Sequence, residues 1–269
     1  MRLPHFAKDN PHVARLMDFW RYGVIKTARK LKAAALSPVM AARGGGVVRS
    51  AYGVLMVPNW QDTTFRYCIF GTYGRDLADL LLRQADDFAF VDIGANQGLY
   101  SLIAAQNPQC RRIIAFEPVP ATHERLAANV ALNGGADRTV LHQLAIAATS
   151  GEVEISVAAG HTGTATLAGR EGKSGGGVII RTIDAPLVDP LLADELPLFV
   201  KIDVEGLEAV VIEELTKTEA FARIAAIFYE VDDRWASAAE IERGLRAGGF
   251  TRFAKYGRGH HYDVLATRS

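Results

Sequence analysis

The sequence has only two cysteines, Cys68 and Cys110, and they follow neither a metal-ligand spacing nor a CxxC motif. This pattern favours two unpaired thiols in a reducing compartment. No apolar run is long enough to span a bilayer. The first residues also lack the apolar core of a signal peptide. We therefore predict a cytoplasmic protein.

The formal net charge is zero, but the charges are unevenly distributed along the chain. Residues 1–50 carry ten Lys/Arg and two Asp/Glu, whereas the remaining chain carries 20 and 28. The acidic remainder argues against a nucleic-acid partner, because phosphate backbones bind to basic surfaces. The seven histidines show no metal-ligand pattern. We therefore expect no nucleic acid and no bound metal.

The basic N-terminal part has the pattern of one amphipathic helix. Asn10 is suited to cap it and Pro11 to occupy its first position. Apolar residues then recur at helical spacing, and we expect the helix to end before Pro38. With the glycines at 44–46 as a hinge, this predicts a helical appendage over 1–46 and a catalytic domain over 47–269. The helix can pack on that domain, pair with a second subunit to form a homodimer, or lie on an anionic membrane as a peripheral contact.

The rest of the chain alternates apolar runs with helical stretches, which predicts an α/β fold with a parallel sheet. Residues 47–58 are expected to be extended, and a loop with Trp60, Tyr67 and Tyr73 follows. An insertion at 152–183 has two strand patterns around a loop rich in Gly, Thr and Ser, a candidate hairpin or lid over the substrate. Strands are expected at 88–93, 112–116, 139–146, 198–202, 225–229, 251–254 and 262–266, and helices at 76–84, 98–106, 120–132, 206–215 and 237–247.

The strongest motif is FVDIGANQGLYSL at 90–102, a strand, a glycine-containing loop and the start of a helix. Open α/β sheets bind ligands at the edge formed by the carboxyl ends of their strands, where this loop is expected to lie. The next strand ends in Glu117, 23 residues after Gly94, near the spacing at which an acid binds ribose hydroxyls. The fingerprint GxGxxG for dinucleotides would need glycine at 94, 96 and 99, but Asn96 and Leu99 stand there. The pattern therefore favours S-adenosylmethionine (SAM) over NAD, with Asp92 near its ammonium group or shaping the loop.

Together with AFEP at 115–118, RTIDAPL at 181–187 and KIDVEGLEAVVI at 201–212, this motif resembles the FkbM family of SAM-dependent methyltransferases. The resemblance covers about residues 88–253. It implies a Rossmann-like sheet with helices on both faces, to which the N-terminal helix is added. It also implies O-methylation of a hydroxyl on a saccharide, a glycan or a related small metabolite. The residues expected to bind SAM are Asp92, Gly94, Asn96, Gly98, Glu117 and Asp203.

Candidate catalytic residues follow the strand at 198–202, near the expected methyl group. A neutral hydroxyl needs a general base, and our candidates are Asp203, then Glu205, then His161 in the insertion. Glu205 can instead cap the next helix, where negative charge is favourable. Asp203, Glu205 and Glu230 can alternatively hold a divalent cation.

Two expectations about single residues and two alternative functions complete the predictions. We expect Lys201 to be an ion-pair partner, and His260 and His261 to be solvated or hairpin residues. An NAD-dependent oxidoreductase and a non-catalytic protein that keeps the fold remain the alternatives to a methyltransferase.

Overall fold

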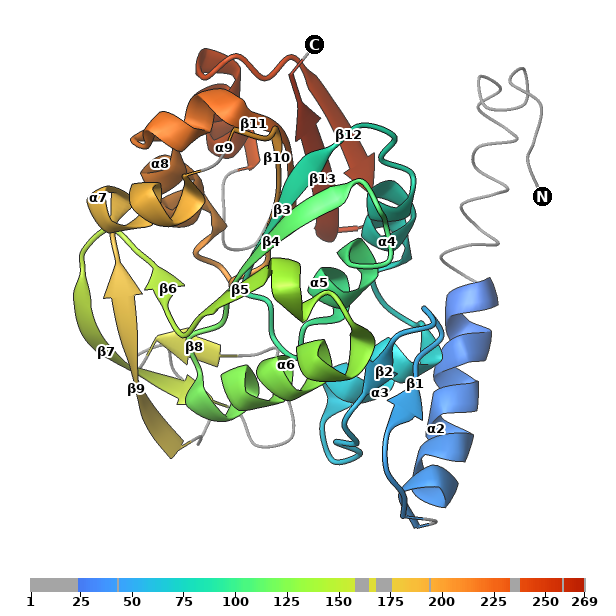
Figure 1. Ribbon diagram of the computed structural model, residues 1–269. Helices are drawn as coiled ribbons and strands as arrows, with labels where there is room; N and C mark the ends of the chain where they lie inside the picture. Colours follow the sequence, from blue (N-terminus) through green and yellow to red (C-terminus); the bar gives the residue numbers. More distant parts are fainter. Residues whose placement is uncertain are drawn as a thin grey trace, which may run out of the picture.

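The computed structural model describes residues 24–42, 44–157, 165–167, 176–193, 195–232, 238–257 and 259–268. Its centre is a seven-stranded sheet in the order β12-β13-β11-β10-β3-β4-β5 (Figure 1). The five strands from β11 to β5 are parallel, and β13 and β12 join them antiparallel at one edge. The bounds of the sheet strands are β3 Phe88–Ile93, β4 Cys110–Phe116, β5 Thr139–His142, β10 Leu198–Ile202, β11 Ile224–Asp232, β12 Arg252–Tyr256 and β13 His261–Thr267.

Side chains of β3 alternate between two apolar cores, one on each face of the sheet. Phe88 and Phe90 pack with α4, α5 and α6, whereas Ala89, Val91 and Ile93 pack with α7, α8 and α9. Helices therefore cover both faces (Figure 1), which confirms the predicted α/β fold. The helices are α4 Arg75–Leu82, α5 Leu99–Ala104, α6 Pro120–Asn133, α7 Ala185–Val188, α8 Glu208–Thr216 and α9 Ala238–Ala247.

The order of the strands creates a switch point between β3 and β10. From β3 the chain adds β4 and β5 on one side, and then crosses to β10 on the other side. The helices after β3 and β10 therefore pack on opposite faces of the sheet, and a crevice forms at its carboxyl edge. Open α/β sheets bind their ligands in this crevice.

The insertion after β5 forms a separate four-stranded sheet in the order β6-β9-β7-β8. The expected strand at 139–146 is wrong as a single element, because it is interrupted at Gln143 and Leu144, and β6 then belongs to the second sheet. The two expected strands of the insertion are confirmed as β7 and β9, and β8 is added. The bounds are β6 Ala145–Ile146, β7 Gly151–Val157, β8 Ala165–Leu167 and β9 Gly176–Ile183.

The segment before the main sheet holds a helix where the sequence suggested a loop. Helix α3, Thr63–Phe70, begins at Asp62, whose carboxylate accepts the backbone N–H of Phe65 at 2.7 Å. It ends at Gly71, which adopts a left-handed conformation with φ 63°. The stretch at 47–58 is extended, as expected, and forms a short hairpin of β1 Val48–Arg49 and β2 Leu55–Met56.

Helix α2, Lys26–Ala42, packs on α3 and continues through Pro38. The expected end before Pro38 is therefore wrong. Pro38 has no N–H to donate to the carbonyl of Ala34, but both residues are exposed, so water can satisfy that oxygen. The hydroxyl of Ser37 donates to the carbonyl of Ala33 at 2.7 Å and supports the same turn.

The structure tests two expectations about helices only within the residues it describes. The expected beginning of the helix at Asn10 lies outside the described residues. Among the described helices, none has the length and apolar character needed to cross a membrane.

Candidate active site

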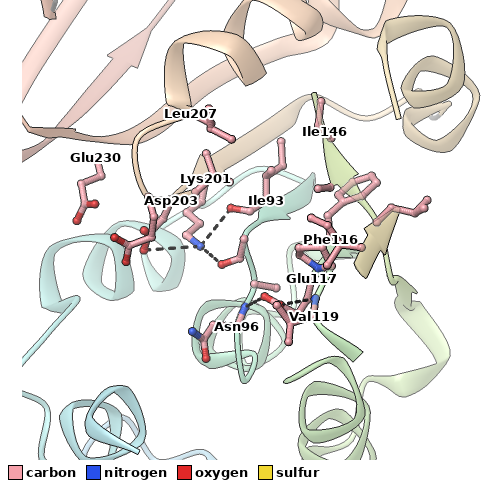
Figure 2. A pocket seen from close by; sticks show the side chains of 18 of the residues that line it. Ile93, Asn96, Phe116, Glu117, Val119, Ile146, Lys201, Asp203, Leu207 and Glu230 are labelled. Carbon is pink, nitrogen blue, oxygen red and sulfur yellow. Dashed lines mark hydrogen bonds and ion pairs between the residues drawn. The ribbon is translucent and has the colours of Figure 1, made fainter. Parts of the chain in front are cut away.

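A cavity of about 660 Å³ lies at the switch point of the sheet. Its walls come from the loops after β3, β4 and β10, with helix α3 and strands of the second sheet completing it. The volume is within the range of small-molecule sites, ~300–1,000 Å³. Figure 2 shows Asp203 and Glu230 at one side of this cavity, and Phe116 and Ile146 at the other.

The β3–α5 loop forms one wall of the cavity, and three of its residues have a left-handed backbone conformation. Gly94, Asn96 and Gly98 have φ of 75°, 51° and 91°. A Cβ on Gly94 would lie 2.0 Å from the carbonyl oxygen of Asp203, so glycine lets the β3 and β10 loops touch. Gly94 and Asn96 line the cavity. Gly98 lies behind it, where a Cβ would meet Leu126 of α6.

Asp92 is fully buried beneath this loop and does not face the cavity. Its Oδ2 accepts hydrogen bonds from the backbone N–H and the hydroxyl of Ser101, at 3.1 and 2.7 Å. Its Oδ1 lies 3.2 Å from Nζ of Lys201. Of the two roles left open for Asp92, this geometry favours shaping the loop.

Lys201 forms the expected ion pair and also lines the cavity. Its Nζ donates to the carbonyl of Gly94 at 2.6 Å and lies 4.0 Å from Oδ2 of Asp203. Burial lowers the pKa of Lys201, but the carboxylates of Asp92 and Asp203 outweigh burial, so the net pKa is raised. The charged ammonium therefore ties the β3 loop to the β10 loop.

Glu117 stands at the end of β4 with its carboxylate on the cavity wall. Its oxygens accept the backbone N–H groups of Asn96, at 2.9 Å, and Val119, at 3.0 Å (Figure 2). An ionised carboxylate has about four acceptor positions, so about two remain for a ligand. Burial raises the pKa of Glu117 to about 7.

Asp203 follows β10 and is held by two partners on the same oxygen. The hydroxyl of Tyr73 donates to Oδ2 at 2.7 Å, and Lys201 lies near that atom. Oδ1 is therefore the atom of Asp203 available to a ligand. Tyr73 precedes α4, and its own carbonyl accepts the hydroxyl of Tyr52. The sequence did not single out Tyr73 as a functional residue.

Glu205 does not cap helix α8, whose N-cap residue is Leu207 and which has no side-chain cap hydrogen bond; Glu208 instead holds the loop before the helix. The carboxylate of Glu208 accepts the backbone N–H groups of Val204, at 3.0 Å, and Gly206, at 3.1 Å. Glu205 has a left-handed φ of 55° and lines the cavity. Desolvation within the cavity and the nearby carboxylate of Asp203 raise the pKa of Glu205 to about 8.

His261 and Glu230 close the acidic side of the cavity. Nε2 of His261 lies 2.7 Å from Oε1 of Glu230, and this hydrogen bond raises the pKa of the imidazole to about 9. Burial and the charge of Asp203 raise the pKa of Glu230. His261 is expected from the sequence to be a solvated or hairpin residue, and its side chain is 59% exposed at the start of β13, which pairs with the preceding strand β12. The structure adds its contact with Glu230 of β11.

The structure does not support the alternative of a cation site, and it does not describe the third candidate base. In the described part of the chain, no group of three His, Cys, Asp or Glu residues has the geometry to hold a metal ion. The carboxylates of Asp203, Glu205 and Glu230 therefore form no such group. The third candidate base, His161, lies outside the described residues.

Comparison with known proteins identifies a family for most of the chain. Residues 92–252 match the family model "Methyltransferase FkbM domain". Over 103 residues the chain is 31% identical to the methyltransferase sdnD of Sordaria araneosa, a match that covers 38% of this chain and 38% of that relative.

Solved structures with related folds are more distant. A ribosomal-protein methylase of Lactobacillus delbrueckii subsp. bulgaricus is 15% identical with a TM-score of 0.45, covering 84% of this chain and 98% of that one. An O-methyltransferase family protein of Burkholderia thailandensis is 11% identical with a TM-score of 0.44, covering 72% and 56%. The family model, by contrast, matches more than half of the chain. The protein therefore belongs to the FkbM methyltransferase family.

Proposed function

We propose that this methyltransferase uses SAM and methylates a hydroxyl oxygen of a saccharide or a related polyhydroxylated metabolite. The observation that carries the cofactor assignment is the carboxylate of Glu117 at the end of β4. It is fixed by two backbone N–H groups and faces the cavity with acceptor positions to spare. Both hydroxyls of one ribose can donate to such a carboxylate.

The β3–α5 loop fits SAM better than a dinucleotide. Asn96 occupies the position where a dinucleotide fold needs its second glycine, and its Oδ1 accepts the backbone N–H of Gln97 at 2.8 Å. Gly94 allows the backbone to lie against the β10 loop, so a ligand there meets main-chain atoms. Asp92 and Lys201 hold this loop from behind. Family membership gives no support to the alternative of an NAD-dependent oxidoreductase.

When bound, SAM supplies an electrophilic methyl group, and the residues of this chain align the acceptor oxygen with it. Asp203 is our candidate general base. Tyr73 and Lys201 occupy the side of Oδ2, so Oδ1 is the atom to which the acceptor hydroxyl delivers its proton. The two partners also restrict rotation of the carboxylate and so fix the direction of that oxygen.

The acidic side of the cavity supports the proposed acceptor class. The carboxylates of Asp203, Glu205 and Glu230 lie on its wall, and each can accept hydrogen bonds from hydroxyl groups. A polyhydroxylated molecule offers several such donors at once. The same negative charge opposes a nucleic-acid acceptor, since phosphates would be repelled.

Thermal unfolding with a panel of SAM, S-adenosylhomocysteine, NAD and NADP tests the cofactor. At about 100 times its dissociation constant, a ligand stabilises the folded state by about 2.7 kcal/mol, or about 5–10 °C for a domain of this size. We expect this shift with the first two compounds. A shift with NAD and none with either SAM compound would overturn the proposal. Formation of S-adenosylhomocysteine with hydroxyl acceptors, and none with amine analogues, then tests the acceptor atom.

A further inference from the structure

Helix α2 packs on the body with one face and leaves an apolar stripe on the opposite face. Ala33 and Ser37 are buried, and Arg29 donates to the carbonyl of Gly71 at 2.8 Å, so these residues define the packed face. Leu31 and Val39 are 67% and 47% exposed on the other side. The exposed apolar stripe comprises Ala28, Leu31, Ala35, Pro38, Val39 and Ala42 of α2, together with Val24 in the turn before it.

The stripe recurs at the spacing of helical turns and carries no charge. Figure 1 shows α2 at the edge of the molecule, with the body on one side of it. An exposed apolar stripe of this kind is uncommon on a helix that already has a buried face, because a surface helix normally places polar residues away from the core. Such a surface marks a site of interaction with another protein or with a membrane.

The charges around the stripe have one sign. Residues 24–50 contain six Lys/Arg and no Asp/Glu. Lys30 and Lys32 are exposed and lie on either side of the stripe at helical spacing. The chain from residue 51 onward is acidic, with 20 Lys/Arg and 28 Asp/Glu. An anionic surface would therefore attract this helix and repel the remainder of the protein, which sets the orientation of approach.

We propose that the outer face of α2 docks on an anionic lipid surface. The apolar stripe would enter the boundary between headgroups and acyl chains, and Lys30 and Lys32 would lie at the level of the lipid phosphates. The lysine stems can extend along the helix so that their ammonium groups reach the headgroups.

Charge complementarity favours lipid over a second copy of the chain. In a symmetric dimer built on this stripe, the same face meets itself. Lys30 and Lys32 of both copies would then approach one another, and neither helix has an acidic residue to pair with them. Anionic headgroups supply the missing negative charge.

Sedimentation of the full chain with vesicles tests this proposal. We expect binding to vesicles of phosphatidylcholine with one third phosphatidylglycerol, and none to phosphatidylcholine alone. Lys30→Glu with Lys32→Glu should weaken binding by at least about 25-fold, because each basic residue near an anionic surface contributes about fivefold and the new carboxylates add repulsion. Leu31→Asp should weaken it by at least about tenfold, since it removes a buried leucine from the boundary.

Leu187→Asp is the matched control, because Leu187 is also an exposed leucine, 50% accessible, but lies on α7. It should bind vesicles like the parent. Equal binding by Leu31→Asp and the parent, or no binding to anionic vesicles, would overturn the proposal. A dimer in light scattering that Leu31→Asp separates would assign the stripe to a second copy. A lower melting temperature of Leu31→Asp without vesicle binding would assign it to residues 1–23 of the same chain.

Discussion

The hydroxyl of Tyr73 donates a hydrogen bond to Oδ2 of Asp203 at 2.7 Å, across 130 positions of the sequence. The family model begins at residue 92, so Tyr73 lies outside the matched region while Asp203 lies within it. The segment before the main sheet therefore contributes directly to the site. Tyr73 is itself held by Tyr52, whose hydroxyl donates to its carbonyl.

Tyr73→Phe tests whether this hydrogen bond positions the carboxylate of Asp203. A hydrogen bond to a charged carboxylate is worth about 1.5–3 kcal/mol. Without it the Asp203 carboxylate can rotate away from the acceptor hydroxyl, so we expect turnover to fall by about ten- to a hundredfold. SAM affinity should stay unchanged. Steady-state turnover and calorimetric titration with SAM measure the two effects.

Tyr67→Phe provides the control, because Tyr67 also lines the cavity from α3. It should leave turnover near that of the parent. If Tyr73→Phe also keeps the turnover of the parent, the hydroxyl does not position Asp203 for the reaction.

The strand ends of the site were predictable because their signals are local in the sequence. Asp92, Glu117 and Asp203 each follow a short apolar run, and parallel strands bring such positions to one edge. The glycines between Asp92 and Glu117 identified the loop in the same way. The structure adds that Gly94 is needed for contact with the β10 loop, while Gly98 packs near α6.

The remaining residues of the site were not predictable because tertiary contacts bring them there. Tyr73 reaches the cavity only because α3 and α4 pack against the β3 and α5 region. The ion pair of Lys201 is expected from the sequence, but its partner Asp92 follows only from the register of β10 on β3. His261 meets Glu230 because β13 inserts antiparallel beside β11. Helix α3 has a local signal at each end, the N-cap residue Asp62 and the C-cap residue Gly71, but its aromatic-rich segment was interpreted as a loop.

Glu117→Gln should weaken SAM binding by about ten- to a hundredfold. The amide group keeps the volume but places N–H donors where one backbone N–H and a ribose hydroxyl need an acceptor. The loss corresponds to about 1.5–3 kcal/mol for hydrogen bonds to a charged group. Isothermal titration measures the affinity, and Glu124→Gln on the exposed side of α6 is the control. Unchanged affinity would remove Glu117 from the cofactor site.

Gly94→Ala should destabilise the protein by about 2–5 kcal/mol. A left-handed conformation costs about 1–2 kcal/mol for a residue with a Cβ, and overpacking costs about 1–3 kcal/mol. The new Cβ would lie 2.0 Å from the backbone oxygen of Asp203, an atom that cannot move without shifting the β10 loop. Gly46→Ala is the control, because no atom lies within 4 Å of its Cβ position. Denaturant titration of both variants should separate them, and equal stabilities would contradict the close approach.

The stability of the fold should decrease as pH rises from about 6 to 9. Burial and the neighbouring charges of Glu230 and Asp203 raise the pKa of Asp263 from 3.8 to about 8. The folded state therefore binds more protons than the unfolded chain between these values, so deprotonation favours unfolding. His261 acts in the same direction, since its pKa rises from 6.5 to about 9 and its contribution is lost above that value.

Asp263→Asn isolates the larger of these effects. The amide cannot ionise, so the fall in melting temperature between pH 6 and 9 should become shallower. Each kcal/mol of relieved repulsion corresponds to about 2–4 °C. Asp137→Asn, at an exposed position, should follow the parent curve. If the Asp263→Asn curve is as steep as that of the parent, the carboxyl of Asp263 does not titrate in this range.

Asp203→Asn tests the proposed base and separates three roles in one variant. Asparagine keeps the size of the side chain and can still accept the hydrogen bond from Tyr73, but it cannot take a proton at neutral pH. If Oδ1 of Asp203 is the base, turnover should fall by about a hundredfold or more, while SAM affinity and melting temperature stay near those of the parent. If Asp203 instead binds the cofactor, SAM affinity should fall together with turnover.

If Asp203 mainly pairs with Lys201, the variant should lose stability, because the ammonium at 4.0 Å keeps only Asp92 as a charged partner. Turnover per folded molecule would then stay near normal. Normal turnover with normal stability would move the base to Glu205. Because burial and Asp203 raise the pKa of Glu205 to about 8, a Glu205 base would require a rate that climbs through that pH. Replacing Asp203 would lower that pKa, since a neighbouring negative charge is removed. The pH profile of Asp203→Asn therefore distinguishes a Glu205 base, whose limb moves to lower pH, from an Asp203 base, whose activity is lost across the whole range.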